Sequence, residues 1–136
     1  MKKLMFSLAM LFVINAYAGE EKYIHQIEID AWDGSTIAAS STGFYDITLG
    51  DYRPEGFASL QVEISGSGTL KIEQTTSNDG LTFNEPSGAS DIVTALTTGS
   101  AIYPFDLSFA KYLRILLTET GGADSVTITK ATLAIQ

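Results

Sequence analysis

Residues 109–136 decide the fold, and they read FAKYLRILLTETGGADSVTITKATLAIQ. In the first half, side chains alternate between two faces, and one face carries three large apolar residues: Leu113, Ile115 and Leu117. This period of two is typical of a β-strand with a buried face. Leu116 adds an apolar side chain to the other face, which predicts a strand in the middle of its sheet. Two glycines at 121–122 then form a turn, so the stretch predicts two long strands.

The alternation slips by one residue in the second half of this stretch. Val126 and Ile128 have even numbers, and the apolar residues that follow have odd numbers: Ala131, Leu133 and Ile135. A slip of one residue moves every later side chain to the other face of a sheet. We therefore expect a β-bulge or a crossing between sheets near residues 129–131, which would keep the apolar side chains inward.

The clearest alternation elsewhere lies at residues 57–65, FASLQVEIS, and at residues 69–76, TLKIEQTT. In each segment apolar and polar residues take turns, as in a strand with one buried face. The Gly-Ser-Gly sequence at 66–68 separates them and is typical of a turn. We expect these two segments to form an antiparallel hairpin.

Shorter patterns predict the remaining strands. They cover residues 23–32, 36–39, 44–49, 81–83, 91–97 and 101–107. Pro104 has no backbone N–H, which puts the last of these at a sheet edge or interrupts it. No segment after residue 18 shows an apolar period of 3.6 residues. The chain therefore predicts an all-β fold, an antiparallel β-sandwich that is jelly-roll-like and has about eight strands.

The first 18 residues have the features of a signal peptide. Two lysines precede an apolar run at 4–14, and the tripeptide Ala-Tyr-Ala at 16–18 fits a cleavage site. The run is shorter than the roughly 20 apolar residues that cross a bilayer, so no membrane insertion is expected after cleavage. We expect residues 19–136 to form a single domain that is exported, to the periplasm or to the cell exterior.

The chain is acidic and has no cysteine. It has 16 Asp and Glu residues against 8 Lys and Arg, and its net charge of −8 becomes −10 once the two lysines of the signal peptide are removed. A surface of this sign repels phosphate backbones and anionic lipids, so nucleic acid is not an expected partner. Without cysteine there is no disulfide, thiol catalysis or Cys-ligated metal. The fold must be held by its core and sheets.

Two motifs resemble parts of a known fold family. Residues 77–83, SNDGLTF, resemble the S-x-D-G-x-x-aromatic hairpin of discoidin-type and other galactose-binding-like jelly rolls. Residues 110–115, AKYLRI, resemble the strand with an aromatic residue and an arginine that follows it there. Similar pairs occur in β-sandwich modules of phage accessory proteins. The resemblance implies a sandwich with a recognition or structural role and assigns no binding residue. Unlike a discoidin domain, this chain is short and lacks the terminal cysteines.

No catalytic set stands out. His25 is the only histidine, and it shares the parity of Ile27 and Ile29 in a predicted strand, which indicates a structural role. The chain has no G-x-S-x-G elbow. A pair of carboxylates is enough for a glycosidase, but a sandwich of this size leaves little room for a deep sugar cleft. We therefore expect no enzymatic activity.

Acidic residues at predicted turns leave a structural Ca²⁺ ion as the one cofactor to consider. Hard cations prefer several oxygen ligands, loop carbonyls included. Asp30, Asp33 and Asp79 lie at or near turns and are the candidate ligands. Two further acidic pairs lie in similar places: Asp51 with Glu55, and Asp79 with Glu85. None has the spacing of an EF-hand loop, and the alternative is a set of solvated acidic turns.

Aromatic residues near loops are candidates for a glycan site, because a flat ring stacks on a sugar face. Trp32 ends a predicted strand, Tyr52 lies in a loop, and Tyr103 lies near a strand end. Arg114 is a candidate for binding an anion at the sheet surface, or for pairing with a carboxylate such as Glu63 or Glu119. The alternative for each aromatic residue is an ordinary place in the core or at a loop anchor.

These observations favour a secreted, non-catalytic binding module that recognises glycans or another cell-surface component. The alternative is a structural subunit of an extracellular fibre, a surface layer or a virion or tail appendage. In that case the partner would be further copies of the same chain.

Overall fold

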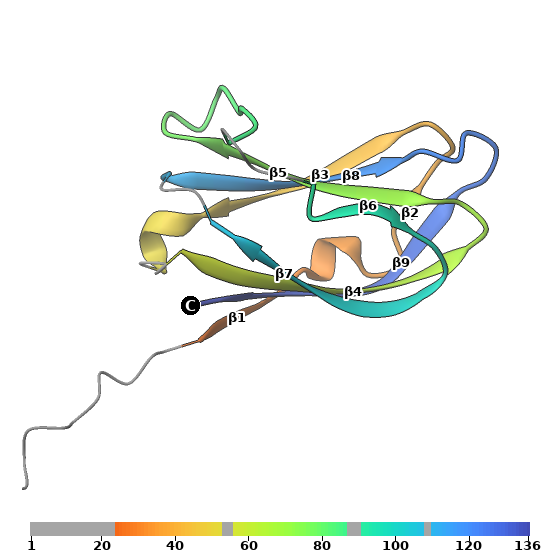
Figure 1. Cartoon of the computed structure of the whole chain (residues 1–136), viewed down its shortest axis with the longest axis horizontal. Coiled ribbons are helices and arrows are strands. Elements are labelled where there is room, and N and C mark those ends of the chain that lie inside the picture. Colours follow the sequence, from red (N-terminus) through yellow and green to blue (C-terminus); the bar gives the residue numbers. More distant parts are fainter. Residues whose placement is uncertain (1–23, 53–55, 87–90, 108–109) are drawn as a thin grey trace, which may run out of the picture.

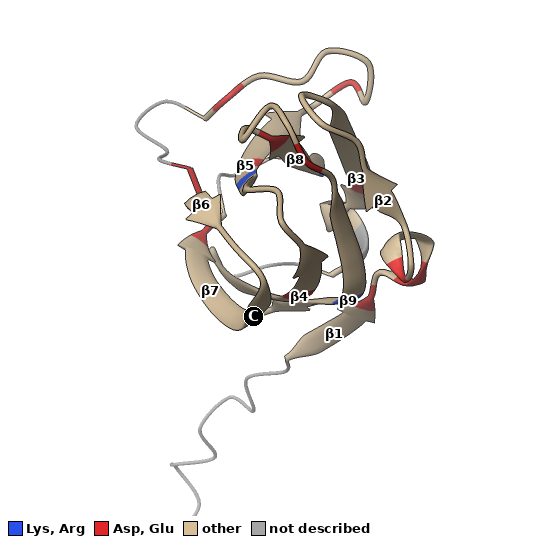
Figure 2. Ribbon diagram, turned by 90° about the vertical axis from the view of Figure 1, so that its right-hand side faces the viewer, with Lys and Arg blue, Asp and Glu red and all other residues tan. Residues whose placement is uncertain are grey.

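The chain folds into two antiparallel β-sheets that pack face to face as two layers (Figures 1 and 2). The computed structural model describes residues 24–52, 56–86, 91–107 and 110–136. The all-β sandwich predicted from the sequence is confirmed. The predicted signal peptide lies outside the described residues. Within the described ranges, no helix has the length and apolar character of a membrane span.

Sheet A has the strand order β1-β9-β4-β7, and the short strand β2 also pairs with β9. Its strands are β1 His25–Glu28, β2 Thr36–Ile37, β4 Phe57–Gly66, β7 Gly99–Asp106 and β9 Val126–Ile135. The expected strand at 23–32 is shorter than predicted, because a 3-10 helix, η1 (Asp30–Trp32), follows β1. The N–H of Trp32 donates to the carbonyl of Ile29 (2.9 Å) and closes this turn.

Sheet B has the strand order β3-β8-β5-β6. Its strands are β3 Thr42–Thr48, β5 Leu70–Ser77, β6 Val93–Leu96 and β8 Tyr112–Glu119. A second 3-10 helix, η2 (Leu49–Asp51), follows β3. Strand β8 lies between β3 and β5, which confirms the central place predicted from Leu116. The short strand expected at 81–83 is not formed; the segment belongs to a turn that a bridge between Thr76 and Asn84 closes.

The connections follow a jelly roll, in which the chain passes back and forth between two sheets. After β1 and β2 in sheet A, the chain goes to β3 in sheet B, β4 in sheet A, and β5 and β6 in sheet B. It ends with β7 in sheet A, β8 in sheet B and β9 in sheet A. Strands that follow one another in the chain are therefore mostly in opposite layers (Figure 1).

The hairpin expected from residues 57–76 is wrong. Strand β4 pairs with β9 and β7, whereas β5 pairs with β8 and β6 in the other sheet. Gly66, with φ of 103°, and Gly68 carry the chain across. A β-carbon at Gly68 would lie only 2.8 Å from Cγ2 of Val126, so the crossing is packed tightly against the start of β9. Alternation fixes which side chains face inward but not which strand is the partner.

The β-bulge expected near residues 129–131 is confirmed. Glu63 of β4 pairs with Lys130, and the next residue, Ile64, pairs with Ile128, so Thr129 has no partner on β4. The extra residue absorbs the slip in alternation. As a result, the apolar side chains on both sides of the bulge all point into the interior.

Strand β7 is the edge strand predicted from Pro104. It pairs with β4 on one side, and Pro104 lies opposite Ser59. The N–H of Leu107 donates to the carbonyl of Gly56 (2.8 Å). Because hydrogen-bonded and non-bonded pairs alternate in an antiparallel ladder, Pro104 falls at a non-bonded position. Its missing N–H therefore lies on the open edge and costs the sheet no hydrogen bond.

The interior between the sheets is apolar. In the described part of the chain, ten apolar side chains have no exposed surface, and they come from both layers: Leu60, Val62, Leu70, Ile72, Leu113, Ile115, Leu117, Ile128, Leu133 and Ile135. Burying a side chain of this size contributes about 1.5–3 kcal/mol. The fold therefore stands without disulfides.

Glu119, at the end of β8, is the buried charged residue of the described part of the chain. Its carboxylate accepts four backbone N–H groups: from Ser40 (2.8 Å), Gly122 (3.0 Å), Thr69 (3.1 Å) and Gly121 (2.6 Å). These hydrogen bonds, those from Ser40 and Gly122 above all, lower the pKa of Glu119 to about 2. The side chain thus joins three loops at one end of the sandwich.

Candidate functional site

The outer face of sheet B gathers the polar and aromatic side chains best suited to contact a ligand. The outward residues form rows across β3, β8 and β5, because paired residues stand side by side. We call this surface the sheet B face, and three rows define it: Thr42, Thr118 and Lys71; Phe44, Leu116 and Glu73; Asp46, Arg114 and Thr75. Successive rows are about 7 Å apart, since each strand residue rises about 3.4 Å.

Arg114 lies in the third row of the sheet B face, on its central strand β8, between two aromatic rings. Its guanidinium carbon is 4.1 Å from the ring centroid of Phe44 and 3.9 Å from that of Phe83. Nε and Nη2 donate to the two carboxylate oxygens of Asp46, at 2.6 and 2.8 Å. These hydrogen bonds raise the pKa of Arg114. The predicted pairing with a carboxylate is thus present, but the partner is Asp46 of β3 rather than Glu63 or Glu119.

Phe83 reaches Arg114 at the end of a turn that side-chain hydrogen bonds close. The carboxylate of Asp79 accepts the N–H groups of Leu81 and Thr82, both at 2.8 Å, and the hydroxyl of Ser77, also at 2.8 Å. These bonds, led by the one from Thr82, lower the pKa of Asp79 to about 2. The serine and aspartate of the S-x-D-G motif therefore shape the turn, and the motif's aromatic residue ends on the sheet B face.

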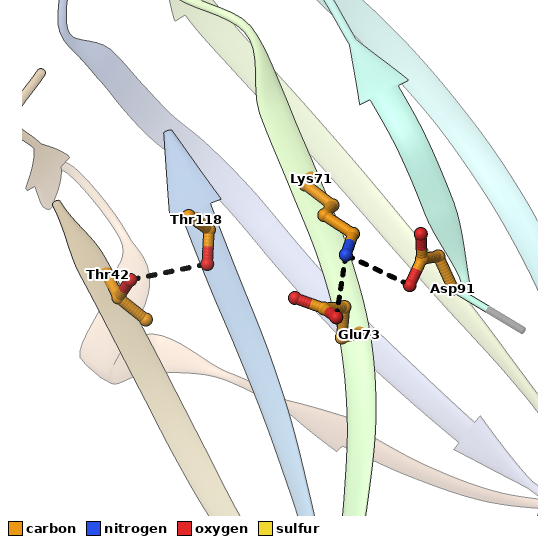
Figure 3. Close-up of polar contacts among 5 residues, drawn as sticks. All are labelled: Thr42, Lys71, Glu73, Asp91 and Thr118. Carbon is orange, nitrogen blue, oxygen red and sulfur yellow. Dashed lines mark hydrogen bonds and ion pairs between the residues drawn. The ribbon is translucent and has the colours of Figure 1, made fainter. Parts of the chain in front are cut away.

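A charged cluster continues the sheet B face toward β6 (Figure 3). Nζ of Lys71 donates to Oε1 of Glu73 at 2.8 Å and lies 3.2 Å from Oδ1 of Asp91. The hydrogen bonds to Glu73 and then to Asp91 raise the pKa of Lys71. In the same row, the hydroxyls of Thr42 and Thr118 are 3.3 Å apart. Donors and acceptors of hydrogen bonds therefore line this end of the face.

Phe44 is the aromatic ring that the sheet B face offers to solvent, with 55% of the residue exposed. Arg114 contacts the ring, and Leu116 is its neighbour across the ladder. The Thr42 and Thr118 hydroxyls lie one row away. An apolar ring held firmly beside hydroxyl and charged groups is a chemical arrangement suited to a sugar, which has an apolar face and a polar rim.

The structure does not bring the predicted aromatic site residues together with Arg114. Trp32 is only 5% exposed and packs edge to face on Tyr45 (5.9 Å between centroids), so its indole is part of the core. Tyr52 is half-buried beside His25, with 5.5 Å between the ring centroids. Tyr103 is half-buried on the inner side of β7 and packs against the core. The alternative stated above, a core or loop-anchoring role, describes these three positions.

The predicted calcium ligands do not converge either. In the described residues, no group of three or more His, Cys, Asp or Glu side chains has the arrangement of a metal site. Asp30 and Asp33 bound the exposed η1 turn, in which the N–H of Asp33 donates to the carbonyl of Asp30 (3.1 Å). One carboxylate oxygen of Asp79 is occupied by N–H donors. Glu55 and the side chain of Asp51 lie outside the described residues.

Sequence reasoning did not identify Phe44, Glu73 or Asp91 as site residues, and it considered Phe83 as the aromatic residue of the motif at 77–83. Alternation does put Phe44 on the outward side of its strand, since Tyr45 and Ile47 point inward. The sequence therefore did contain evidence for Phe44, because its position in the alternation predicts that its ring faces outward. The contact of Phe83 with Arg114 spans 31 positions of sequence and depends on a pairing that parity does not encode.

Comparison with known proteins leaves the family open. No family model matches the chain, so the resemblance to galactose-binding-like domains stays a prediction. No curated protein matches it either. Among solved structures, the chain is similar to the crystal structure of YomS, a protein derived from the SPBc2 prophage, at 15% sequence identity and a TM-score of 0.44. The match covers 84% of this chain and 94% of YomS, and it is too distant to assign a function.

Proposed function

We propose that this protein is a non-catalytic binding module that recognises glycans through the sheet B face. The observation that carries the proposal is Phe44, a half-exposed ring fixed by Arg114 beside a row of hydroxyl and charged groups. Both motifs that resemble galactose-binding-like domains contribute to this face: residues 77–83 deliver Phe83, and residues 110–115 deliver Arg114. Arg114 was predicted to bind the ligand itself, and in this proposal it instead positions the two rings.

The chemistry of the face suits a neutral glycan better than an acidic one. Arg114 is already paired with Asp46, and Lys71 with Glu73 and Asp91. A sugar carboxylate would have to break one of these ion pairs, whereas a neutral hydroxyl can donate to a carboxylate without displacing the cation. The acidic net charge of the chain adds a repulsion toward anionic polymers.

The proposed role includes export and an absence of catalysis. An exported module, in the periplasm or outside the cell, meets glycans that a protein inside the cell does not. The charged groups of the sheet B face are held as ion pairs on one open sheet surface, and such an arrangement serves recognition rather than proton transfer. Calcium is not required by this site, because its carboxylates have protein partners.

A glycan array tests the proposal, followed by calorimetry on the best ligand. We expect Phe44→Ala to weaken binding at least tenfold, because the ring is the stacking surface. Phe57→Ala is the matched control: Phe57 is 58% exposed, on the outer side of sheet A. Binding should survive removal of calcium with EDTA. A protein that binds no glycan, with or without calcium, would contradict the proposal, as would equal losses in both variants.

The second candidate function is a structural subunit that packs on copies of itself. The observation that favours it is a pair of exposed apolar residues, Phe57 and Ile102, on the outer side of sheet A. Electron microscopy of the concentrated protein separates the two functions. Regular fibres or layers would favour the subunit, and isolated particles that bind a glycan would favour the binding module.

A further inference from the structure

The two sheets end in open edges that differ in how well they can accept a further strand. Strand β7 has Pro104 on its open side, and β1 and β6 are only four residues long. Strand β3 runs for seven residues without proline or lysine, and it pairs with β8 on one side (Figure 2). Proline, lysine and short length are the usual protections of a sheet edge. Within the described residues, β3 is therefore the edge best suited to strand addition.

The hydrogen-bond ladder shows which backbone groups of β3 face away from β8. At one end, the N–H of Leu49 donates to the carbonyl of Lys111 at 2.9 Å. At the other end, the N–H of Glu119 donates to the carbonyl of Ser41, also at 2.9 Å. Bonded and non-bonded pairs alternate in an antiparallel ladder, so the odd-numbered residues of β3 bond to β8. The even-numbered residues direct their N–H and C=O groups to the open side, where no described backbone group pairs with them: Thr42, Phe44, Asp46 and Thr48.

These unpaired groups define the shape of an occupant. From Thr42 to Thr48 they extend over roughly 20 Å, at about 3.4 Å per residue. Donors and acceptors alternate along this line with the spacing of a β-strand. A further strand presents its own donors and acceptors at the same spacing, and addition of a peptide to a sheet edge is a recurring mode of recognition. The edge therefore suits an extended polypeptide.

The structure under this edge sets the inward side chains of such a strand. Trp32 packs edge to face on Tyr45, with 5.9 Å between the ring centroids. A β-carbon at Gly43 would lie 2.8 Å from Cδ1 of Ile37, so β2 packs directly beneath β3. Tyr45 stays half-buried, and a side chain opposite it on an added strand would lie beside its ring. The inward residues of the occupant should therefore be apolar.

The surroundings of the edge are acidic. Residues 26–52, which include η1, β2 and β3, contain five acidic residues and no Lys or Arg. Asp46 of β3 accepts hydrogen bonds from Arg114 on its β8 side, and 43% of its side chain is exposed. A basic side chain opposite Asp46 on an added strand would contact the same carboxylate from the open side. The charges of this edge therefore suit a basic occupant.

We propose that the open edge of β3 binds an extended, basic segment of a different protein, which joins sheet B as an added strand. The segment carries an apolar residue opposite Phe44 and a Lys or Arg opposite Asp46. A second copy of this chain is a poorer occupant, because its own β3 brings another aspartate and no basic residue to the edge. The inference goes beyond the glycan proposal, since backbone groups at the side of the sheet make the contact.

Calorimetry with blocked synthetic peptides tests the inference on the purified protein, in the absence of any glycan. The probe is Lys-Thr-Val-Lys-Val-Tyr-Val-Thr-Lys. In an antiparallel alignment its middle lysine lies opposite Asp46 and its tyrosine lies opposite Phe44. We expect a dissociation constant on the order of 100 µM, which rises at least threefold between about 50 mM and about 500 mM NaCl. The same peptide with glutamate at each lysine should not bind.

Methylation of single peptide nitrogens separates strand pairing from a simple attraction between charges. In the stated alignment the N–H of the tyrosine faces β3, so its methylation should weaken binding at least tenfold. The valine just before it directs its N–H away from β3, and methylation there should change the affinity less than threefold. Equal losses for the two methylated peptides would overturn the inference.

Two matched variants locate the contact. Asp46→Asn should weaken binding of the probe at least fivefold. Glu63→Gln removes the same charge from an exposed position on β4, in the other sheet, and should change the affinity less than twofold. Circular dichroism confirms that each variant is folded. Equal losses in the two variants would overturn the inference, as would no binding at about 1 mM peptide. So would self-association of the peptide-free protein that Asp46→Asn alters, because the edge would then belong to a second copy.

Discussion

Arg114 should stabilise the fold as well as shape the sheet B face, and Arg114→Gln tests this. The substitution removes the guanidinium group that lies 4.1 and 3.9 Å from the ring centroids of Phe44 and Phe83. It also leaves Asp46 without its partner. The glutamine amide keeps polarity and part of the length, so the change isolates the cation from the bulk of the side chain.

The expected cost follows from the three contacts. A cation–π contact at a partly exposed site contributes about 0.5–1 kcal/mol, and there are two of them. The ion pair adds at most about 0.5 kcal/mol, because 43% of the Asp46 side chain is exposed and water screens the charges. The free energy of unfolding should therefore fall by about 1–2.5 kcal/mol. The melting temperature should fall by roughly 4 °C for each kcal/mol.

Urea unfolding followed by tryptophan fluorescence measures this cost. Trp32 is the only tryptophan and is 5% exposed, so its emission reports loss of the core. Arg114→Lys keeps the charge but not the flat donor group, and should lose about half as much. Lys111→Gln is the control, since the Lys111 ammonium lies 5.2 Å from a single ring and is exposed.

A double-mutant cycle decides whether the rings are responsible. Arg114→Gln and Phe44→Ala together should cost about 0.5–1 kcal/mol less than the sum of the single changes. If Arg114→Gln stays within about 0.5 kcal/mol of the wild type, the stack contributes nothing to stability. In that case Arg114 would not be what holds Phe44 and Phe83 in place.

Three further predictions concern the fold. The pKa of Glu119 is about 2 in the folded chain, against an ordinary value of 4.5. The stability that the ionised Glu119 gives to the fold is therefore complete above pH 4.5 and is lost as the pH falls toward 2. The free energy of unfolding of Glu119→Gln should fall less steeply with acid over this range. Gly68→Ala should cost about 1–3 kcal/mol in urea unfolding, because its β-carbon would meet Val126, and an unchanged midpoint would refute the tight crossing. Deletion of Thr129 removes only the bulge, so near-ultraviolet circular dichroism should still show a folded protein. Deletion of Thr132 should unfold the protein, because Leu133 and Ile135 would then turn outward, at a cost of about 1.5–3 kcal/mol each.

Local patterns predicted what depends on local physics. The alternation in residues 109–136 gave the central strand, and its slip gave the bulge at Thr129. Pro104 predicted the sheet edge, because a missing N–H acts at its own position. These features follow from the period of a strand and from the chemistry of one residue, so no knowledge of the partner strand was needed.

Features that depend on distant partners were missed. Strands β4 and β5 have the pattern of a hairpin, yet each pairs in a different sheet, because parity does not identify the neighbour. Trp32 looked like an exposed strand end, but the 3-10 turn after Ile29 folds it inward. The candidate site depends on such partners too: Arg114 was identified as a candidate, whereas the two rings that hold it come from other parts of the chain.

The most direct test of glycan recognition by the sheet B face is a nuclear magnetic resonance titration. Isotope-labelled protein would be titrated with the best ligand from the array, and amide shifts would be mapped on the strands. We expect the shifts to cluster at the outward positions of β3, β8 and β5, around Phe44 and Thr118, and to vanish in Phe44→Ala. Shifts that cluster on β4 and β7 instead, or no shifts at a saturating ligand concentration, would contradict the assignment.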